Sequence, residues 1–295
     1  TSTELGYLDG VTSSIQTQLD SKISAGLVSV TENSNTGYRL ASANASNHGD
    51  IGDGGLDLSY QPSASTTTGS TGDYSTAMGN YTTASGLNST AMGAVTAASG
   101  NTSTAMGYET TASGDLSTAM GYHTEANKSY STSMGNGTKA SGVASTAMGS
   151  NTIASGQASI AMGISSIASG DNSTAIGYIT TATGIYSTAM GGGSLASAPT
   201  STAMGYNTIA SGNNSTAMGG QSTASGNNST AMGSNTLASG EKSIAMGEST
   251  AATGDYSTAM GSNTTASGDN STAMGWEATA SDYSSTVIGQ HNSSG

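Results

Sequence analysis

The residues best suited to hold a metal ion stand close together in the first quarter of the chain. His48, Asp50, Asp53 and Asp57 lie within ten positions of one another. Carboxylate oxygens and an imidazole nitrogen can together bind a cation. Asp and Gly are also ordinary turn residues, and this segment is rich in both. The sequence therefore leaves two interpretations, a metal site with His48, Asp50 and Asp53 as ligands or a polar loop, and it favours the loop.

Further acidic residues recur at one position of a 14-residue pattern. They are Asp73, Asp115, Asp171, Glu241, Asp255 and Asp269. Carboxylates stacked at one corner of a repetitive fold would attract calcium or a cationic ligand. However, they do not occur in every unit, and the G-G-x-G-x-D pattern of calcium-binding β-rolls is absent. A solvated polar turn is the favoured interpretation.

Catalytic motifs are missing from the sequence. Glycoside hydrolysis needs two carboxylates about 5–9.5 Å apart, one of them with a raised pKa. Turn carboxylates in separate units supply neither the spacing nor the burial. No nucleophile elbow, P-loop or dinucleotide fingerprint stands at a strand–helix junction. We therefore expect no enzyme activity and no cofactor.

Aromatic side chains recur at two positions of the same pattern. One position holds Tyr108, Tyr122, Tyr178, Tyr206 and Trp276; the other holds Tyr74, Tyr130, Tyr186 and Tyr256. Exposed aromatic rings can bind sugars or protein surfaces, and they can equally cover a neighbouring turn. A broken apolar stripe at a third position is either a receptor strip or part of a contact between chains. It consists of Ile153, Ile167, Leu195, Ile209 and Leu237.

The pattern that places these side chains is a repeat of 14 residues. The unit S-T-A-M-G-x-x-T-x-A-S-G-x-x runs sixteen times from Ser75 without insertion or deletion. Two Gly per unit and many Ser and Thr oppose a helix. Two short strands per unit, joined by turns, predict an all-β solenoid whose coils stack in parallel.

The fourteen positions of the unit are numbered from its first Ser, and the residues that share a position in successive units form a column. Alternation along each strand places neighbouring columns on opposite sides of the strand. We expect columns two, four, eight and ten inside the coil, with the Met of column four as the large filler. This predicts a structural core of Met78, Met92, Met106, Met120, Met134, Met148, Met162, Met190, Met204, Met218, Met232, Met246, Met260 and Met274. Buried Thr hydroxyls would then form stacked ladders. Ser and Ala of columns one and three would face outwards, against partner chains that supply the burial a thin core lacks.

This unit resembles the head repeat of YadA-type trimeric autotransporter adhesins, S-V-A-I-G-x-x-S-x-A-x-G. The resemblance covers Ser75–Gly295 and implies a left-handed parallel β-roll assembled as a homotrimer. It departs from the usual pattern by Thr in column two and Met in column four. These departures leave open how the side chains pack, but they do not change the architecture that the resemblance implies.

Two segments precede the repeats. Residues 1–23 resemble a segment of phage tail-fibre proteins, and their apolar spacing predicts a short helix in a trimeric coiled-coil neck. Residues 24–74 are aperiodic; strands are expected over Gly26–Thr31 and Gly37–Leu40 and a loop over His48–Tyr60. We interpret this region as an adaptor that caps the first coil of the β-roll, residues 75–295.

Composition narrows the function further. The net charge is −13, with only five Lys and Arg, so nucleic-acid binding is not expected. No apolar run reaches the length of a membrane helix, which predicts no membrane insertion in this segment. The start lacks Met and a signal-peptide pattern, so we expect a piece of a longer or processed chain.

The favoured function is a structural and adhesive fibre segment outside the cell, binding a cell-surface glycan or protein. It would belong to a phage or injection-device fibre or to a bacterial surface adhesin. The alternatives are an ice-binding β-solenoid and a capsule-degrading fibre enzyme. The inward Thr columns predicted above count against ice binding.

Overall fold

The computed structural model of the chain describes residues 26–294. They fall into two compact units, residues 26–116 and 117–294. The regular secondary structure of both is almost entirely β-strand, and the one helical element among the described residues is a 3-10 turn, η1 (Ala45–Asn47). The coiled-coil neck predicted over residues 1–23 lies outside the described residues.

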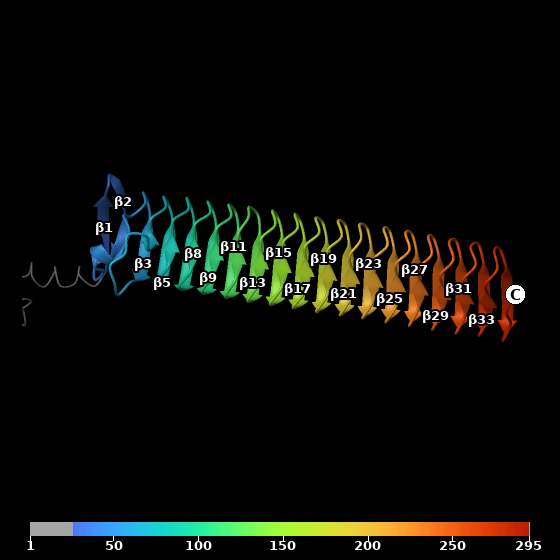
Figure 1. Cartoon of the computed structure of the whole chain (residues 1–295). Coiled ribbons are helices and arrows are strands. Elements are labelled where there is room, and N and C mark those ends of the chain that lie inside the picture. Colours follow the sequence, from blue (N-terminus) through green and yellow to red (C-terminus); the bar gives the residue numbers. More distant parts are fainter. Residues whose placement is uncertain (1–25, 295) are drawn as a thin grey trace, which may run out of the picture. The chain divides into compact units, whose positions relative to one another are not determined.

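The first unit joins an antiparallel hairpin to a stack of parallel coils (Figure 1). The hairpin strands are β1 (Leu27–Glu32) and β2 (Asn35–Leu40). The coils follow as β3 (Leu56–Tyr60), β4 (Gly69–Ser70), β5 (Thr76–Asn80), β6 (Thr83–Ala84), β7 (Thr90–Ala94), β8 (Ala97–Ala98), β9 (Thr104–Tyr108) and β10 (Thr111–Ala112). The strands expected at Gly26–Thr31 and Gly37–Leu40 are thus confirmed, each shifted by one or two residues.

The second unit repeats one coil throughout. Its long strands are β11 (Thr118–Tyr122), β13 (Thr132–Asn136), β15 (Thr146–Ser150), β17 (Ile160–Ile164), β19 (Thr174–Tyr178), β21 (Thr188–Gly192), β23 (Thr202–Tyr206), β25 (Thr216–Gly220), β27 (Thr230–Ser234), β29 (Ile244–Glu248), β31 (Thr258–Ser262), β33 (Thr272–Trp276) and β35 (Thr286–Gln290). Its short strands are β12 (Glu125–Ala126), β14 (Lys139–Ala140), β16 (Ile153–Ala154), β18 (Ile167–Ala168), β20 (Thr181–Ala182), β22 (Leu195–Ala196), β24 (Ile209–Ala210), β26 (Thr223–Ala224), β28 (Leu237–Ala238), β30 (Ala251–Ala252), β32 (Thr265–Ala266) and β34 (Thr279–Ala280).

Neighbouring coils pair in parallel with a register of one repeat. In the long strands Met218 lies beside Met232, and in the short strands Ala224 lies beside Ala238. Like residues therefore stack in columns along each unit. The all-β parallel solenoid predicted from the repeat is confirmed.

The interior of a coil is lined by small side chains. In the coil that starts at Ser145, that residue, Ala147, Thr152 and Ala154 are all fully buried. Met148 lies on the outer side of β15 and is only half-buried. Columns eight and ten therefore lie inside as predicted. In the first strand, columns one and three lie inside and columns two and four outside, which is the reverse of the prediction.

All fourteen Met residues, from Met78 to Met274, lie outside the coil, and the prediction of a Met core is wrong. Alternation correctly put columns two and four on one side of the strand, but a coil of fourteen residues encloses space only for Ala, Ser and Thr. The Thr of column two, such as Thr146, is half-buried on the same outer side as Met. Ser and Ala of columns one and three were predicted to face outwards, but they fill the interior.

Some of the hydroxyl groups inside the coils bond to neighbouring coils and turns. Thr180 Oγ1 donates to Ser166 Oγ at 2.9 Å, and Ser166 Oγ donates to the carbonyl oxygen of Gly177 at 3.0 Å. Ser145 Oγ donates to the carbonyl oxygen of Gly142 at 2.7 Å. Where Thr follows Ser in column eight, as at Ser166 and Thr180, the hydroxyls bond between coils. Where Thr stacks on Thr, as at Thr82, Thr96 and Thr110, the buried hydroxyls have no hydrogen-bond partner among the described residues, so the expected ladder of stacked Thr is not formed there.

The parallel stack begins before the sixteen repeats. Strand β3 pairs with β5, so that Leu56, Asp57 and Leu58 lie beside Thr76, Ala77 and Met78. The loop predicted through Tyr60 is therefore wrong for Leu56–Tyr60. Strand β2 of the hairpin pairs with β3 and covers that edge of the sheet, as expected of a cap.

Candidate functional site

The first coil differs from all later ones by a charge in its interior. Asp57 occupies the interior position that Ala77 takes in the next coil, and it is 1% exposed. A buried carboxylate is costly unless it is paired and hydrogen-bonded. The residues around Asp57 are arranged to meet that requirement.

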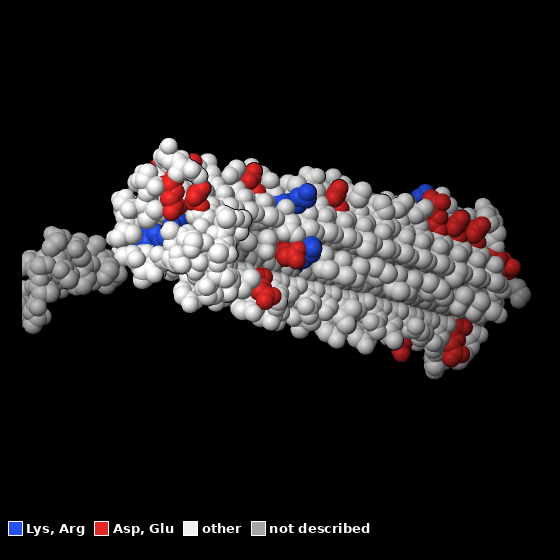
Figure 2. Space-filling model, turned by 60° about the vertical axis from the view of Figure 1, so that its left-hand side comes forward, with Lys and Arg blue, Asp and Glu red and all other residues white. Residues whose placement is uncertain are grey.

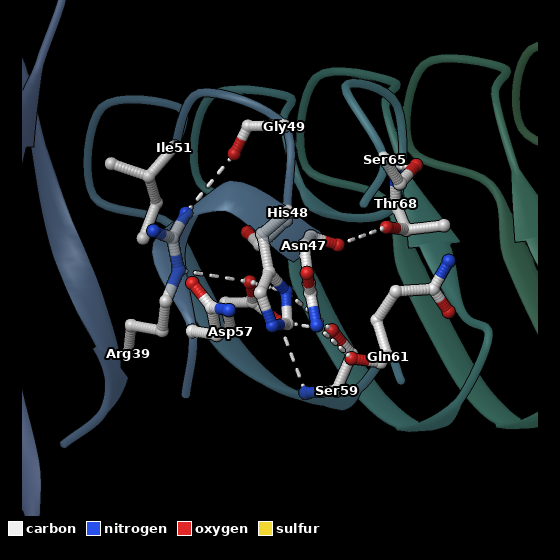
Figure 3. A network of polar contacts seen from close by, with 12 residues as sticks. Arg39, Asn47, His48, Gly49, Ile51, Asp57, Ser59, Gln61, Ser65 and Thr68 are labelled. Carbon is white, nitrogen blue, oxygen red and sulfur yellow. Dashed lines mark hydrogen bonds and ion pairs between the residues drawn. The ribbon is translucent and has the colours of Figure 1, made fainter. Parts of the chain in front are cut away.

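Arg39 supplies the opposite charge from strand β2 (Figure 3). Its Nε donates to Asp57 Oδ2 at 3.2 Å. Its Nη1 and Nη2 donate to the two carboxylate oxygens of Glu32 at 2.9 and 3.2 Å, and Nη2 also donates to the carbonyl oxygen of Gly49 at 3.0 Å. Glu32 Oε2 in turn accepts from the backbone N–H of Ile51 at 2.8 Å. This network, called the cap network below, ties the hairpin to the loop before β3.

His48 and Ser59 complete the surroundings of Asp57. His48 Nδ1 lies 3.0 Å from Asp57 Oδ2, and Ser59 Oγ donates to Asp57 Oδ1 at 2.6 Å. Burial raises the pKa of Asp57, but the bonds from His48 and Ser59 outweigh it and hold the pKa below its ordinary value. Burial also raises the pKa of Glu32, and the bonds from Arg39 and Ile51 bring it below the ordinary value.

The contacts of Ser59, His48 and Asp57 do not form a catalytic triad. In a triad the Asp and the Ser bind opposite nitrogens of the imidazole, so that a proton can pass from Ser to His. Here Ser59 Oγ lies 3.2 Å from Nδ1, the nitrogen that also faces Asp57. The arrangement stabilises a buried carboxylate and does not activate a nucleophile.

The predicted metal ligands do not converge. His48 pairs with Asp57, whereas Asp50 accepts a hydrogen bond from Asn33 and Asp53 lies 3.4 Å from the backbone N–H of Thr36. Among residues 26–294, no group of three or more His, Cys, Asp or Glu has the geometry of a metal site. These residues belong to the contacts of the adaptor with the hairpin.

A cavity of about 450 Å³ lies beside this network. Its lining includes His48 and Ser59 from the network, Asn44 and Asn47 around η1, and Tyr60 at the end of β3. No acidic or basic side chain lines it apart from His48. The cavity is the concave site of the adaptor that could receive a small molecule.

The recurring acidic residues are part of the turns. The backbone N–H of Gln157 donates to Asp171 Oδ1 of the next coil at 2.8 Å, and Asp255 donates in the same way to Asp269 Oδ1 at 2.9 Å. Asn227 takes the same role towards Asn213 at 3.1 Å. Each of the five Asp carboxylates of this column thus accepts from a backbone N–H earlier in the chain, whereas Glu241 pairs with Lys242. These contacts support the turn interpretation.

The column-six aromatic side chains project into solvent. Tyr178 and Tyr206 are 58% and 64% exposed, and Gly192 lies between them in the ladder. Trp276 packs against His291, with ring centroids 5.2 Å apart, so it covers a turn. Tyr108, Tyr122 and Trp276 are each about half-exposed.

The second unit carries two different outer faces. The face of the long strands holds Met and Thr, or Ile in place of Thr at 160 and 244. The face of the short strands holds the apolar stripe of column nine, with Ile153, Ile209 and Leu237 each close to 37% exposed. Charge is sparse on the surface seen in Figure 2; the Lys139–Glu125 pair, 2.8 Å apart, lies on the short-strand face.

The cap network was missed in the sequence because its partners lie far apart along the chain. One signal was available: Arg39 is the only Arg in the sequence. Arg is the cation favoured in buried ion pairs, because its guanidinium fits a carboxylate. Its partners Glu32 and Asp57 lie seven residues before it and eighteen after it, which only the pairing of β2 with both neighbours explains.

Parallel coils, columns of identical residues and a capped first strand define a structural repeat protein. The YadA head domain repeat matches residues 70–95, 98–124, 126–152, 154–178, 182–208, 210–236, 238–264 and 266–292. The chain therefore belongs to the YadA head domain repeat family, which is a family of structural, surface-exposed adhesin heads in bacteria that form homotrimers in general.

No curated protein matched the chain. The family match begins at residue 70 and lends no support to the phage tail-fibre resemblance of residues 1–23, which also lie outside the described residues. Among the described residues, no helix is long and apolar enough to span a membrane.

Proposed function

We propose that this chain is a segment of a homotrimeric adhesin on a bacterial surface, in which three copies associate through their long-strand faces. The observation that carries the proposal is the outward column of Met. In the second unit eleven Met side chains, with Ile176 and Ile288, follow one another on this face. The left-handed winding of the coil stays an expectation from the family resemblance.

An outward Met column favours association because the coil interior is so thin. Buried Ala, Ser and Thr supply little apolar area to offset chain ordering. Full burial of a Met side chain is worth about 1.5–3 kcal/mol, and in a single chain these side chains are only half-buried. Covering the remainder would add about 1 kcal/mol per coil. In the first unit, Leu56 and Leu58 hold the corresponding positions beside Thr76 and Met78.

Light scattering with native mass spectrometry tests the assembly. The unaltered protein should have the mass of three chains. The double substitution Met204→Asp with Met232→Asp should dissociate it, because it places charges in the contact. The matched control is Ile209→Asp with Leu237→Asp, which alters exposed apolar residues of the short-strand face in the same coils and should leave the trimer intact. A monomeric unaltered protein, or dissociation of the control, would contradict the proposed interface.

Attachment is a separate step and needs its own measurement. Beads coated with the trimer should bind cultured host cells in a saturable manner. Beads coated with the same protein after heat denaturation serve as the control. If coated and control beads bind equally, the trimer is a spacer and the receptor-binding part lies elsewhere.

Ice binding is the second candidate, because the Thr of column two faces outwards and not inwards. Thr202, Thr216 and Thr230 stack in register on a parallel sheet, which gives a regular spacing. Met shares that face, however, and the proposed trimer would cover both columns. Thermal hysteresis measured on the trimer and on the Met204→Asp/Met232→Asp variant decides between the two uses. Hysteresis in either sample would favour ice binding.

A further inference from the structure

The cavity of the adaptor has the chemistry of a site for an uncharged polar ligand. Its walls combine the apolar side chains of Leu40 and Pro62 with the amides and hydroxyls of Asn44, Asn47 and Ser42. Neither Asp57, Glu32 nor Arg39 lines it, because the cap network keeps these charges against one another. At about 450 Å³ it lies within the ordinary size range of small-molecule sites, about 300–1,000 Å³.

Several polar atoms of the lining remain available to a ligand. His48 is buried and its Nδ1 is engaged by Asp57, but among residues 26–294 its Nε2 has no partner. Asn44 uses Oδ1 to accept from Ser46 N at 3.2 Å and from Ser46 Oγ at 2.8 Å, and its Nδ2 has no partner within the described part of the chain. These atoms place a hydrogen-bonding group at the buried wall and another at the rim.

The lining is held in place by contacts that do not use those atoms. Asn47 Nδ2 donates to the carbonyl oxygen of Gln61 at 2.7 Å, and Thr68 Oγ1 donates to the carbonyl oxygen of Asn47 at 3.1 Å. Figure 3 shows these bonds beside the Arg39–Asp57 pair. A site whose walls are fixed before binding loses less conformational entropy when the ligand enters.

An aromatic ring stands at the mouth of the cavity. Tyr60 lines the cavity and is 65% exposed. Sugar rings combine an apolar face, which packs on an aromatic ring, with hydroxyls that bind amides and imidazole. A lining of amides, hydroxyls and one imidazole, without Lys, Arg or a carboxylate, beside an exposed tyrosine favours a neutral sugar over an anionic one.

We infer that the cavity between η1 and the end of β3 binds a neutral hexopyranose unit of a glycan, with Tyr60 packing on the sugar ring and Asn44 and His48 bonding its hydroxyls. The inference names a ligand class for the proposed attachment function and in that sense rests on it. The trimer and the cavity are measured separately, so either can fail without the other.

Saturation-transfer NMR and calorimetry on the full chain test the inference with a fixed set of sugars. The neutral probes are galactose, glucose and N-acetylglucosamine, and the anionic probes are glucuronate and N-acetylneuraminate. At least one neutral sugar should bind with a Kd of about 1 mM, the strength usual for a single small contact site. Tyr60→Ala should weaken that binding roughly tenfold, the loss of about 1.4 kcal/mol of packing.

Tyr74→Ala is the matched control, because Tyr74 is equally exposed, at 61%, in the same unit but does not line the cavity. It should bind the sugar as the unaltered protein does, and circular dichroism should show both variants folded. The inference is overturned if no neutral sugar binds saturably, if only the anionic sugars bind, or if the two tyrosine variants lose binding equally. Trimer mass measured in the same samples keeps a failed sugar site distinct from a failed assembly.

Discussion

At the scale of single residues, two adjacent glycines show how closely the coils approach. Gly219 and Gly220 both end strand β25. A Cβ on Gly219 would lie 2.0 Å from the carbonyl oxygen of Gly233 in the next coil, and its φ is +108°. A Cβ on Gly220 would have no atom within 4 Å.

We therefore expect Gly219→Ala to disrupt the stack and Gly220→Ala to leave it intact. The first substitution must push two coils apart at a backbone atom that cannot move aside, and it adds backbone strain at positive φ. Thermal unfolding followed by circular dichroism should show a large fall in melting temperature for Gly219→Ala alone. Equal melting temperatures would mean that the coils tolerate greater separation than the structure shows.

The corners of the coils place non-glycine residues in the left-handed region. Both columns seven and fourteen have φ between about +51° and +63° in every described coil. Asn and Gly suit this conformation, and Asn occurs often at both columns. A β-branched residue such as Ile179, with φ +54°, is strained there.

Replacing Ile179 by Asn should stabilise the protein by about 1 kcal/mol, because the left-handed conformation costs an ordinary residue about 1–2 kcal/mol. Ile164 is the matched control, since it is equally exposed, at 51% against 49%, on ordinary backbone. Ile164→Asn should change the stability little. The urea midpoint of unfolding measures both; a gain shared by the two variants would indicate an effect of surface polarity and not of backbone strain.

The sequence predicted which residues form columns, but it did not predict which columns of the first strand face the interior of the coil and which face outwards. Alternation fixed that Thr and Met share a side, and the Gly spacing fixed where the coil turns. The inside was assigned to Met because large apolar side chains are normally buried within one chain. That expectation holds only when the fold encloses enough volume, and a coil whose interior holds Ala147, Thr152 and Ala154 does not.

At the scale of elements, the hairpin β1–β2 depends on one buried arginine. Arg39 is 3% exposed and bonds Glu32, Asp57 and the backbone of Gly49. Removing one partner of a buried ion pair commonly costs roughly 3–5 kcal/mol, because the other charge stays buried alone. The cap should therefore open locally when Arg39 is lost.

Arg39→Met should speed hydrogen exchange throughout residues 27–60 and leave residues 117–294 unchanged. The apolar replacement roughly keeps the volume and removes the guanidinium from the buried Asp57 and from Glu32. Hydrogen exchange with mass spectrometry resolves the two units, which a single melting curve would not. The matched variant is Lys139→Met, which breaks a solvent-exposed pair and should have little effect. Unchanged exchange in residues 27–60 would show that strand pairing alone holds the hairpin.

Acid should open the same element. A carboxylate whose pKa is lower in the folded state stabilises the fold above its unfolded pKa, and that stabilisation is lost as the pH falls through the folded pKa. The pKa values of Asp57 and Glu32 are both held below their ordinary values. Exchange in residues 27–60 should therefore accelerate as the pH falls below about 4, once corrected for the intrinsic rate, and Asp57→Asn should weaken this dependence. A pH-independent opening would contradict the role of the carboxylates.

The cap network was less predictable than the repeat for a physical reason. A repeat can be recognised from the regular spacing of residues along the sequence. The cap network joins β2, the loop at Gly49 and β3, and these contacts depend on strand pairing that no local sequence pattern encodes. His48 and Asp57 were identified as a polar cluster and do lie 3.0 Å apart. Asp57 also bonds the Arg39 guanidinium, a partner that the sequence analysis did not identify.

At the scale of the whole molecule, the two outer faces of the second unit differ in regularity, which indicates different roles. The Met face is regular from coil to coil, as a contact between identical chains requires. The short-strand face changes from the Glu125–Lys139 pair to the apolar stripe between Ile153 and Leu237 and then to Ala and Thr. Regularity suits self-association, and variation along the surface suits recognition of other molecules.

Oxidation of Met provides a readout of the regular face in the intact protein. Thioether sulfur reacts with peroxide when it is accessible, and the sulfoxide is polar. In a single chain the Met side chains of the second unit are half-buried, whereas in the proposed trimer they would be covered. The unaltered protein should therefore be oxidised slowly by dilute hydrogen peroxide, and the Met204→Asp/Met232→Asp variant several times faster at its remaining Met residues.

Peptide mapping by mass spectrometry assigns each sulfoxide to its coil. The Ile209→Asp/Leu237→Asp variant, altered on the short-strand face, should be oxidised as slowly as the unaltered protein. Because oxidation makes the face polar, trimer mass should fall as sulfoxide accumulates, in proportion to the number of coils modified. Rapid, uniform oxidation of the unaltered protein with its trimer mass preserved would place the contact between chains on another face.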